Sequence, residues 1–103
     1  MINIVLFCST GLSTKLLIKK MEQAAAELQL EISVKSYPEV QIGNYIVGAD
    51  VVLAGPQVKY ALPHIQEECK LANIPLEVIS AKDYGLMDGM KILNQALRLV
   101  KKD

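Results

Sequence analysis

One cysteine of the sequence stands where a thiol could do chemistry. Cys8 follows the apolar run of residues 2–7 and opens a hydroxyl-rich segment, after which the pattern becomes helical. A turn from a strand into a helix presents backbone N–H groups and the positive end of the helix dipole, which favour a bound anion. The same groups should favour the thiolate of Cys8 over the thiol. The segment therefore predicts a nucleophile beside a phosphate-binding loop made by Ser9, Thr10, Gly11, Leu12, Ser13 and Thr14.

A buried, inert thiol and an ordinary helix cap at Ser13 are the structural alternatives to this interpretation. Gln57 follows a Gly-Pro turn and could donate its amide to a phosphate, although a plain helix start explains it equally well. Tyr84 could support the site by touching a ligand or a partner. Cys69 falls on an apolar helical stripe and is predicted to pack in the core. His64 has no evident metal-binding partners in the sequence, so no metal site is predicted.

Composition narrows the class of protein. The 103 residues suit one domain, and a hydrophobic content of 51% suffices for one compact core. Basic and acidic residues balance at 11 each, which argues against nucleic acid as the main partner. We see no signal peptide and no run of the roughly 20 apolar residues that a membrane span needs. The two cysteines have no zinc-binding spacing, so a reduced, cytoplasmic protein without a metal or cofactor is expected.

Strand-like and helix-like patterns alternate along the chain. The strand-like runs are residues 2–7, 31–37, 51–54 and 76–79, and the helical patterns are residues 13–28, 57–72 and 88–102. Pro63 should interrupt or shift the start of the second helical pattern. A weaker segment, residues 39–48, is predicted as a short helix, and residues 80–85 as a loop.

This alternation predicts an α/β fold: a single three-layer domain with a four-stranded parallel sheet of order 2-1-3-4. Such a sheet is flavodoxin-like, and it also resembles the scaffold of the low-molecular-weight phosphatases. Ligand sites in these sheets lie beyond the carboxyl ends of the strands, where the strand order reverses. The first and third strands flank that point. We therefore expect Cys8 to lie beside the turn at Gly55, with the segment after the fourth strand on the same rim.

The segment from Leu6 to Thr14 resembles the phosphocysteine loop of the IIB components of the bacterial sugar phosphotransferase system (PTS), in the lactose/cellobiose (chitobiose) family. Residues 49–58 resemble the third strand of that family with its Gly-Pro-Gln turn, and residues 79–89 resemble its late loop. Length and element order also agree, so the resemblance covers residues 1–103 as one IIB domain.

The resemblance implies a phosphotransferase that carries a phosphoryl group on Cys8. A phosphohistidine of a IIA protein would be the donor, and a sugar held by the membrane protein IIC would be the acceptor. The family's phosphate-binding loop falls on Ser9 to Thr14. The sugar would be a β-linked disaccharide such as cellobiose, chitobiose or lactose. The protein would be cytoplasmic, would associate transiently with the inner face of the membrane through IIC, and would need no cofactor.

Two other functions remain open from the sequence. A small cysteine-dependent phosphatase or arsenate reductase places an arginine six residues after its cysteine to grip phosphate, and Thr14 stands at that position here. A non-catalytic flavodoxin-like module is the third interpretation. A phospho-receiver of that kind would need acidic residues after the first strand, where Ser9 and Thr10 stand instead.

Overall fold

The computed structural model describes residues 1–8, 12–37 and 46–100, with only the backbone at residues 12 and 13. Four parallel strands form its sheet in the order β2-β1-β3-β4, as the sequence predicts. The strands are β1 (Ile2–Phe7), β2 (Ile32–Tyr37), β3 (Val51–Ala54) and β4 (Leu76–Val78). No helix of the described ranges is long and apolar enough to cross a membrane.

The two central strands are apolar because both of their faces are covered. All four residues of β3 and the last four of β1 are buried, and successive side chains of β1 enter different clusters. Ile4 and Leu6 face one layer of helices, whereas Val5 and Phe7 face the other.

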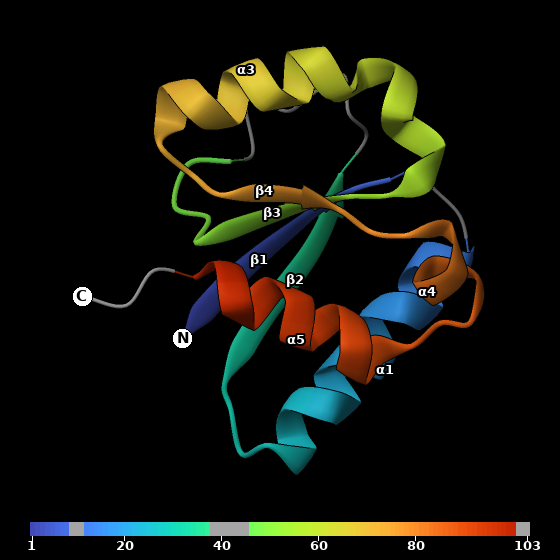
Figure 1. Cartoon of the computed structure of the whole chain (residues 1–103). Coiled ribbons are helices and arrows are strands. Elements are labelled where there is room, and N and C mark those ends of the chain that lie inside the picture. Colours follow the sequence, from blue (N-terminus) through green and yellow to red (C-terminus); the bar gives the residue numbers. More distant parts are fainter. Residues whose placement is uncertain (9–11, 38–45, 101–103) are drawn as a thin grey trace.

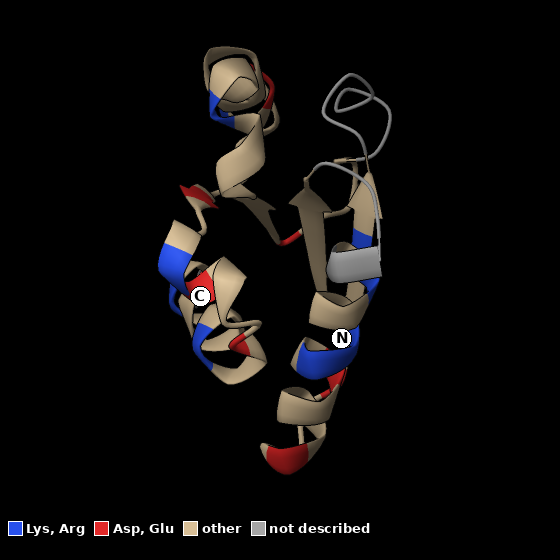
Figure 2. Ribbon diagram, turned by 90° about the vertical axis from the view of Figure 1, so that its right-hand side faces the viewer, with Lys and Arg blue, Asp and Glu red and all other residues tan. Residues whose placement is uncertain are grey.

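Helices cover both faces of the sheet, which makes the predicted three layers (Figure 1). The helices α1 (Leu12–Glu27) and α5 (Gly89–Leu99) lie side by side on one face. The 3₁₀ helix η2 (Pro56–Ala61) and α3 (Leu62–Ala72) lie on the other face. Basic and acidic residues are interspersed along the helices (Figure 2), as expected for a chain with no net charge.

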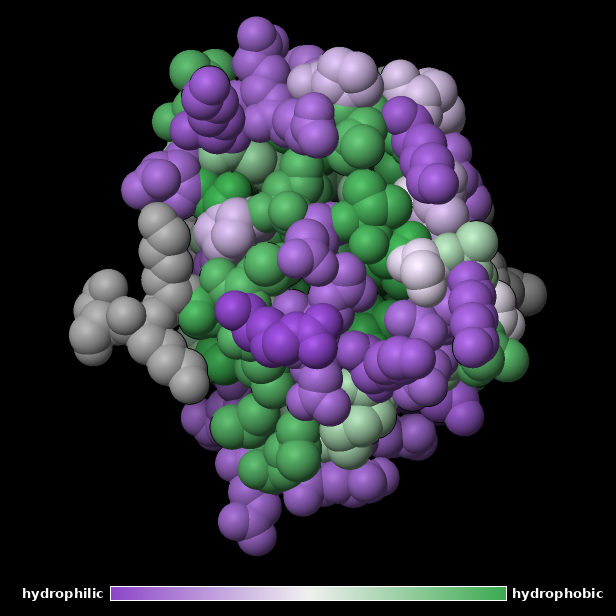
Figure 3. All heavy atoms as spheres, viewed as in Figure 1, coloured by the Kyte–Doolittle hydropathy of each residue, from purple (hydrophilic) through white to green (hydrophobic). Residues whose placement is uncertain are grey.

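The edge of the sheet at β4 is partly covered by α5. Figure 3 shows apolar side chains on this side of the molecule, where Leu76 and Val78 are half-buried. Gln95 of α5 donates its amide to the Val78 carbonyl at 3.1 Å and to Glu77 Oε1 at 2.7 Å. The bond to Val78 occupies a backbone carbonyl of an edge strand that would otherwise be open to pairing with another chain.

One sequence prediction is wrong after the fourth strand. The predicted loop contains a short helix, α4 (Ala81–Gly85), and Ser80 caps it by accepting the Asp83 N–H at 3.0 Å. Five residues are too few to display a helical period. The available signal was the cap itself, a serine with an acidic residue three positions later.

The predicted helix at residues 57–72 is divided into η2 and α3. Pro56 and Pro63 each occupy one of the first two positions of these helices, where a missing N–H costs nothing. Val58 has non-helical angles (φ −106°, ψ 23°), so the axis bends inside η2. The expected shift of the helix start at Pro63 is confirmed. Most of the predicted short helix at residues 39–48 lies outside the described residues.

Candidate active site

The strand register brings the carboxyl ends of β1, β3 and β4 to one level. Phe7 pairs with Ala54, and Ala54 pairs with Val78, so the residue after each strand lies on the same edge. The Gly55 N–H donates to the Phe7 carbonyl at 2.9 Å. Cys8 and the turn at Gly55 are therefore neighbours where the strand order reverses, as predicted.

Gly55 lies directly under the sulfur of Cys8. A Cβ added to Gly55 would lie 3.1 Å from Cys8 Sγ and would overlap the side-chain oxygen of Gln57. The φ of Gly55 is −69°, an angle that any residue can adopt. Glycine is needed at this position because a side chain would not fit, and not because of its backbone conformation. The structure therefore brings Gln57, with its exposed side chain, next to Cys8.

We expect Gly55→Ala to disturb Cys8 without unfolding the protein. The added methyl would press on the sulfur and displace Gln57, while the backbone keeps its ordinary angles. Alkylation of Cys8 by iodoacetamide should slow by roughly tenfold, since small displacements of reacting atoms have large effects on rate. Cys69 in the same molecule is the internal control, read by peptide mass spectrometry. An unchanged ratio of the two labelling rates would contradict this account.

Tyr84 is buried beside the last residue of the predicted phosphate loop. Its hydroxyl lies 3.0 Å from Thr14 Oγ1, and the two residues are 6% and 2% exposed. Tyr84 belongs to α4, and Thr14 lies in the first turn of α1. The Tyr84 side chain is therefore inside the core, in contact with Thr14. Its predicted contact with a ligand or a partner, and its support of the site, stay predictions.

The remaining residues of the predicted loop are described only in part. Ser9, Thr10 and Gly11 lie outside the described residues, and Leu12 and Ser13 begin the backbone of α1. The segment after Cys8 therefore does lead into the start of a 16-residue helix. Phosphate binding by residues 9–14 stays a prediction.

The expected low pKa of Cys8 is wrong for the free protein. Burial raises the pKa of the Cys8 thiol to about 11, and the nearby Gly55 N–H lowers it by less. Cys8 is 1% exposed and packs in the core cluster between the sheet and α1. Burial, followed by the negative charge of Glu68, also raises the pKa of Cys69 to about 11. Desolvation disfavours the charged form at both sites, so the resting Cys8 is a neutral thiol.

The alkylation of both cysteines should therefore keep accelerating at high pH. The rates in the folded protein should rise about tenfold per pH unit until about pH 11, whereas thiols of the unfolded chain level off above a pKa of about 8.5. The folded state holds these two protons more tightly than the unfolded state. The two thiols therefore make their full contribution to the free energy of unfolding below about pH 8.5, and this contribution is lost as the pH rises through about 11. Iodoacetamide labelling from pH 7 to 11 measures the profile, and a plateau for Cys8 near pH 8 would contradict it.

Cys69 is a core residue, as predicted. It is 2% exposed and packs with Val58 and Ile65 on the opposite face of the sheet from Cys8. His64 is exposed, and one ligand atom from each of His64, Glu67 and Glu68 lies within 4.8 Å of the others on α3. This is the one group among the described residues that could hold a metal ion, and Cys8 is not part of it.

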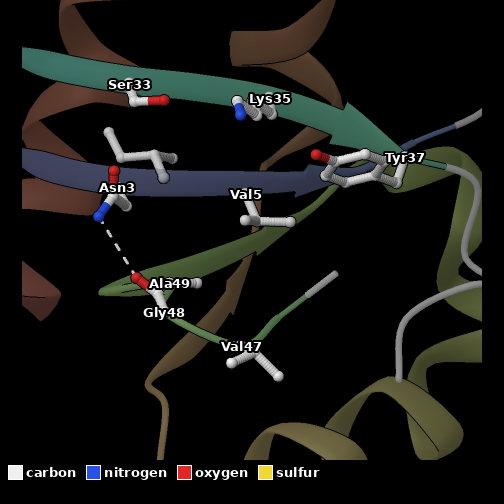
Figure 4. Close-up of a pocket in the computed structure, with 9 residues that line it drawn as sticks. Asn3, Val5, Ser33, Lys35, Tyr37, Val47, Gly48 and Ala49 are labelled. Atoms are coloured by element: carbon white, nitrogen blue, oxygen red, sulfur yellow. Dashed lines mark hydrogen bonds between the residues drawn. The ribbon is translucent and has the colours of Figure 1, made fainter. Parts of the chain in front are cut away.

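A groove of about 280 Å³ lies on the sheet beside β2 and does not include Cys8. Figure 4 shows Ser33, Lys35 and Tyr37 along one side of it, with Asn3 donating to the Gly48 carbonyl at 3.3 Å. The sequence offered no signal for this groove, because alternating residues of an edge strand are half-exposed in any sheet of this kind.

The protein is a doubly wound α/β protein, because its parallel sheet has helices on both faces. The Cys8 thiol, a candidate nucleophile, lies where the strand order reverses, which is the edge where such sheets bind ligands. Residues 3–95 match the family model of the lactose/cellobiose-specific IIB subunits of the PTS. The chain belongs to this family. It is a IIB component of a sugar PTS of the cellobiose, lactose or galactose type, and it is a phosphotransferase. Components of this kind work with IIA and IIC partners in sugar transport.

Relatives are similar along nearly the whole chain. A galactose-specific EIIB component of Lactococcus lactis subsp. cremoris is 36% identical over 102 residues, covering 94% of each chain. A cellobiose-specific EIIB component of Lactococcus lactis subsp. lactis is 35% identical, with the same coverage. An oligo-beta-mannoside-specific EIIB component of Bacillus subtilis is 37% identical over 98 residues, covering 95% of each chain.

Solved structures agree with the fold. The solution structure of a cellobiose-specific IIB component from Borrelia burgdorferi has a TM-score of 0.82 and 31% identity, covering 96% of this chain and 91% of that one. A lactose-specific IIB domain from Streptococcus pneumoniae has a TM-score of 0.84, covering 97% and 98%. Its 13% identity supports the fold alone.

Proposed function

We propose that Cys8 is the residue that carries the phosphoryl group. It accepts this group from a phosphohistidine of IIA and passes it to a sugar bound by IIC. The observation that carries the proposal is the position of Cys8, at the end of a central strand, on the switch-point edge and immediately before the segment that leads into α1. Within this proposal, residues 1–103 act as one IIB domain.

In both transfer steps the bonds and protons balance when the Cys8 thiol is neutral at rest. In the first step, the N–P bond of phosphohistidine breaks and an S–P bond forms at Cys8. The thiol proton leaves with the imidazole nitrogen, which becomes basic as it loses the phosphoryl group. In the second step, the S–P bond breaks, an O–P bond forms on a sugar hydroxyl, and the hydroxyl proton returns to the sulfur. A pKa of about 11 for Cys8 suits this scheme, because no free thiolate has to persist between the steps.

Helix-start N–H groups supply the stabilisation that phosphoryl transfer needs. The transition state spreads its charge over three equatorial oxygens, so positioning and hydrogen-bond donors do most of the catalysis. The segment from Ser9 to Thr14 follows Cys8 in the sequence and ends in the first turn of α1, and it is proposed to bind these oxygens. Gln57 lies over Gly55 beside the sulfur, where its amide can add a further contact.

The chain lacks the arginine on which a cysteine phosphatase depends. Thr14 occupies the corresponding position, and its side chain is buried against Tyr84. Arg98, the sole arginine of the sequence, is exposed in the last turn of α5. Without a bidentate partner for the phosphoryl oxygens, hydrolysis of the phosphothiol should be slow, which a carrier requires.

The proposed substrate is a β-linked disaccharide such as cellobiose, chitobiose or lactose. The names of the relatives include cellobiose and an oligo-beta-mannoside, both of which are β-linked sugars. The proposed location of the protein is the cytoplasm, where it would bind transiently to the inner face of the membrane through IIC.

The test is to incubate the protein with a phosphorylated IIA component and to measure its intact mass. A gain of one phosphoryl group, mapped to Cys8 by peptide analysis, is the expected result. The isolated protein should not turn over an aryl phosphate. No mass gain, or steady Cys8-dependent hydrolysis of the ester, would overturn the carrier function.

A further inference from the structure

We propose that α3 carries a binding site for one divalent transition-metal ion of the zinc class, formed by the side chains of His64, Glu67 and Glu68. One ligand atom from each of these residues lies within 4.8 Å of the others. An imidazole nitrogen with two carboxylate oxygens is a donor set that zinc and its first-row neighbours accept. The site goes beyond the phosphoryl carrier function, because Cys8 is not part of it.

The three ligands come together because α3 is helical through all of them. His64, Glu67 and Glu68 occupy positions i, i+3 and i+4 of the helix Leu62–Ala72, and such positions are neighbours on one face. Ile65 and Cys69 of the same helix are buried against the sheet, so the backbone that bears the ligands is fixed. A metal ion would therefore be bound by a preformed helix face, without a rearrangement of the chain.

The ligand atoms need only a small approach to close on an ion. Zinc bonds of about 2.0 to 2.2 Å in tetrahedral geometry hold neighbouring ligand atoms roughly 3.5 Å apart, so the present separations shorten by roughly 1 Å or less. His64 and Glu67 are exposed and Glu68 is half-buried, so rotation of the outer side chains meets no packing. Three protein ligands leave a fourth position for water, as in other open zinc sites.

The charges of the site have no other partner. In the described part of the chain, no hydrogen bond or ion pair uses the side chain of His64, Glu67 or Glu68. Two carboxylates that are adjacent in the sequence repel one another, and the helix dipole favours acidic side chains only near the N-terminus, whereas Glu67 and Glu68 lie in the second half of α3. A bound dication would remove this repulsion.

The imidazole of His64 decides the class of metal. Magnesium and calcium take oxygen ligands, whereas imidazole suits zinc, copper, nickel and iron. The two thiols do not compete for the ion, because both are buried and neutral at rest. The site also lies on the opposite face of the sheet from α1 (Figure 1), so its occupancy can be measured without phosphoryl transfer.

The test is a calorimetric titration of the untagged protein with Zn²⁺, which should bind one ion per chain. His64→Gln should weaken zinc binding by more than about 100-fold, since even the outer partners of metal ligands are worth about 10- to 100-fold. Glu67→Gln and Glu68→Gln should each weaken it by at least about 10-fold. All of these changes are on the outer surface of α3 or half-buried, and circular dichroism checks that each variant is folded.

Glu22→Gln, an exposed position of α1, is the matched control and should bind zinc as the wild type does. The Cys8→Ser, Cys69→Ser double variant should also keep its zinc affinity. Zinc should shift the amide NMR signals of residues 64–68 most, and Mg²⁺ at the same concentration should not shift them. Wild-type affinity in His64→Gln, shifts centred on Cys8, or equal binding of Mg²⁺ would overturn the site. None of these results depends on charging by IIA, so the carrier function stands or falls separately.

Discussion

Cys8→Ser should abolish phosphoryl acceptance, with a fall in rate of at least about 10³-fold, as for the loss of the nucleophile in other enzymes. A serine hydroxyl in this buried position is a much weaker nucleophile than a thiol. A phosphoserine would also be a poor donor to a sugar, because its oxygen leaves less readily than sulfur. Phosphoryl acceptance is measured as the gain in intact mass after incubation with phosphorylated IIA.

The matched control for this prediction is Cys69→Ser. Cys69 is also buried, and its thiol also has a pKa of about 11, but it belongs to α3 and packs on the other face of the sheet. Cys69→Ser should lower stability slightly, since it buries a hydroxyl, and should leave charging intact. Full charging of the Cys8→Ser protein, or loss of charging in folded Cys69→Ser, would refute the assignment of the carrier to Cys8.

Gly89→Ala should be strongly destabilising although it adds only one methyl group. A Cβ at Gly89 would lie 2.6 Å from the Lys20 carbonyl oxygen and 2.7 Å from Lys20 Cβ. Backbone atoms of α1 cannot move aside as a flexible side chain can, so α5 would have to shift away from α1. We expect a loss of about 2 kcal/mol in the free energy of unfolding. For a domain of this size, the loss corresponds to a fall in Tm of about 10 °C.

Gly85→Ala provides the comparison for Gly89→Ala. Gly85 ends α4, has no positive φ, and has no atom within 4 Å of an added Cβ. Its replacement should leave stability unchanged or raise it by about 0.5 kcal/mol through the lower entropy of the unfolded chain. Thermal unfolding followed by circular dichroism distinguishes the two. Equal Tm values for both variants would show that the close approach of α1 and α5 is not tight.

The order of the strands and the place of Cys8 could be predicted from the sequence because they depend on local patterns. The short apolar runs at β1 and β3 are uninterrupted, which is typical of strands covered on both faces. Alternation with helical patterns then leaves few parallel topologies, and the strand ends fall on one edge. Cys8 and Gly55 are therefore close in any sheet of order 2-1-3-4.

The protonation state and the supporting contacts of the site were decided only by the tertiary structure. The sequence predicted a thiolate from the helix start, but the packing of Cys8 between the sheet and α1 makes desolvation the stronger effect. The contact of Tyr84 with Thr14 joins residues 70 positions apart. It depends on α4, a helix too short to have a period of its own. Local patterns place a residue at an edge of the sheet, but its burial and its distant partners follow from how the helices pack over that edge.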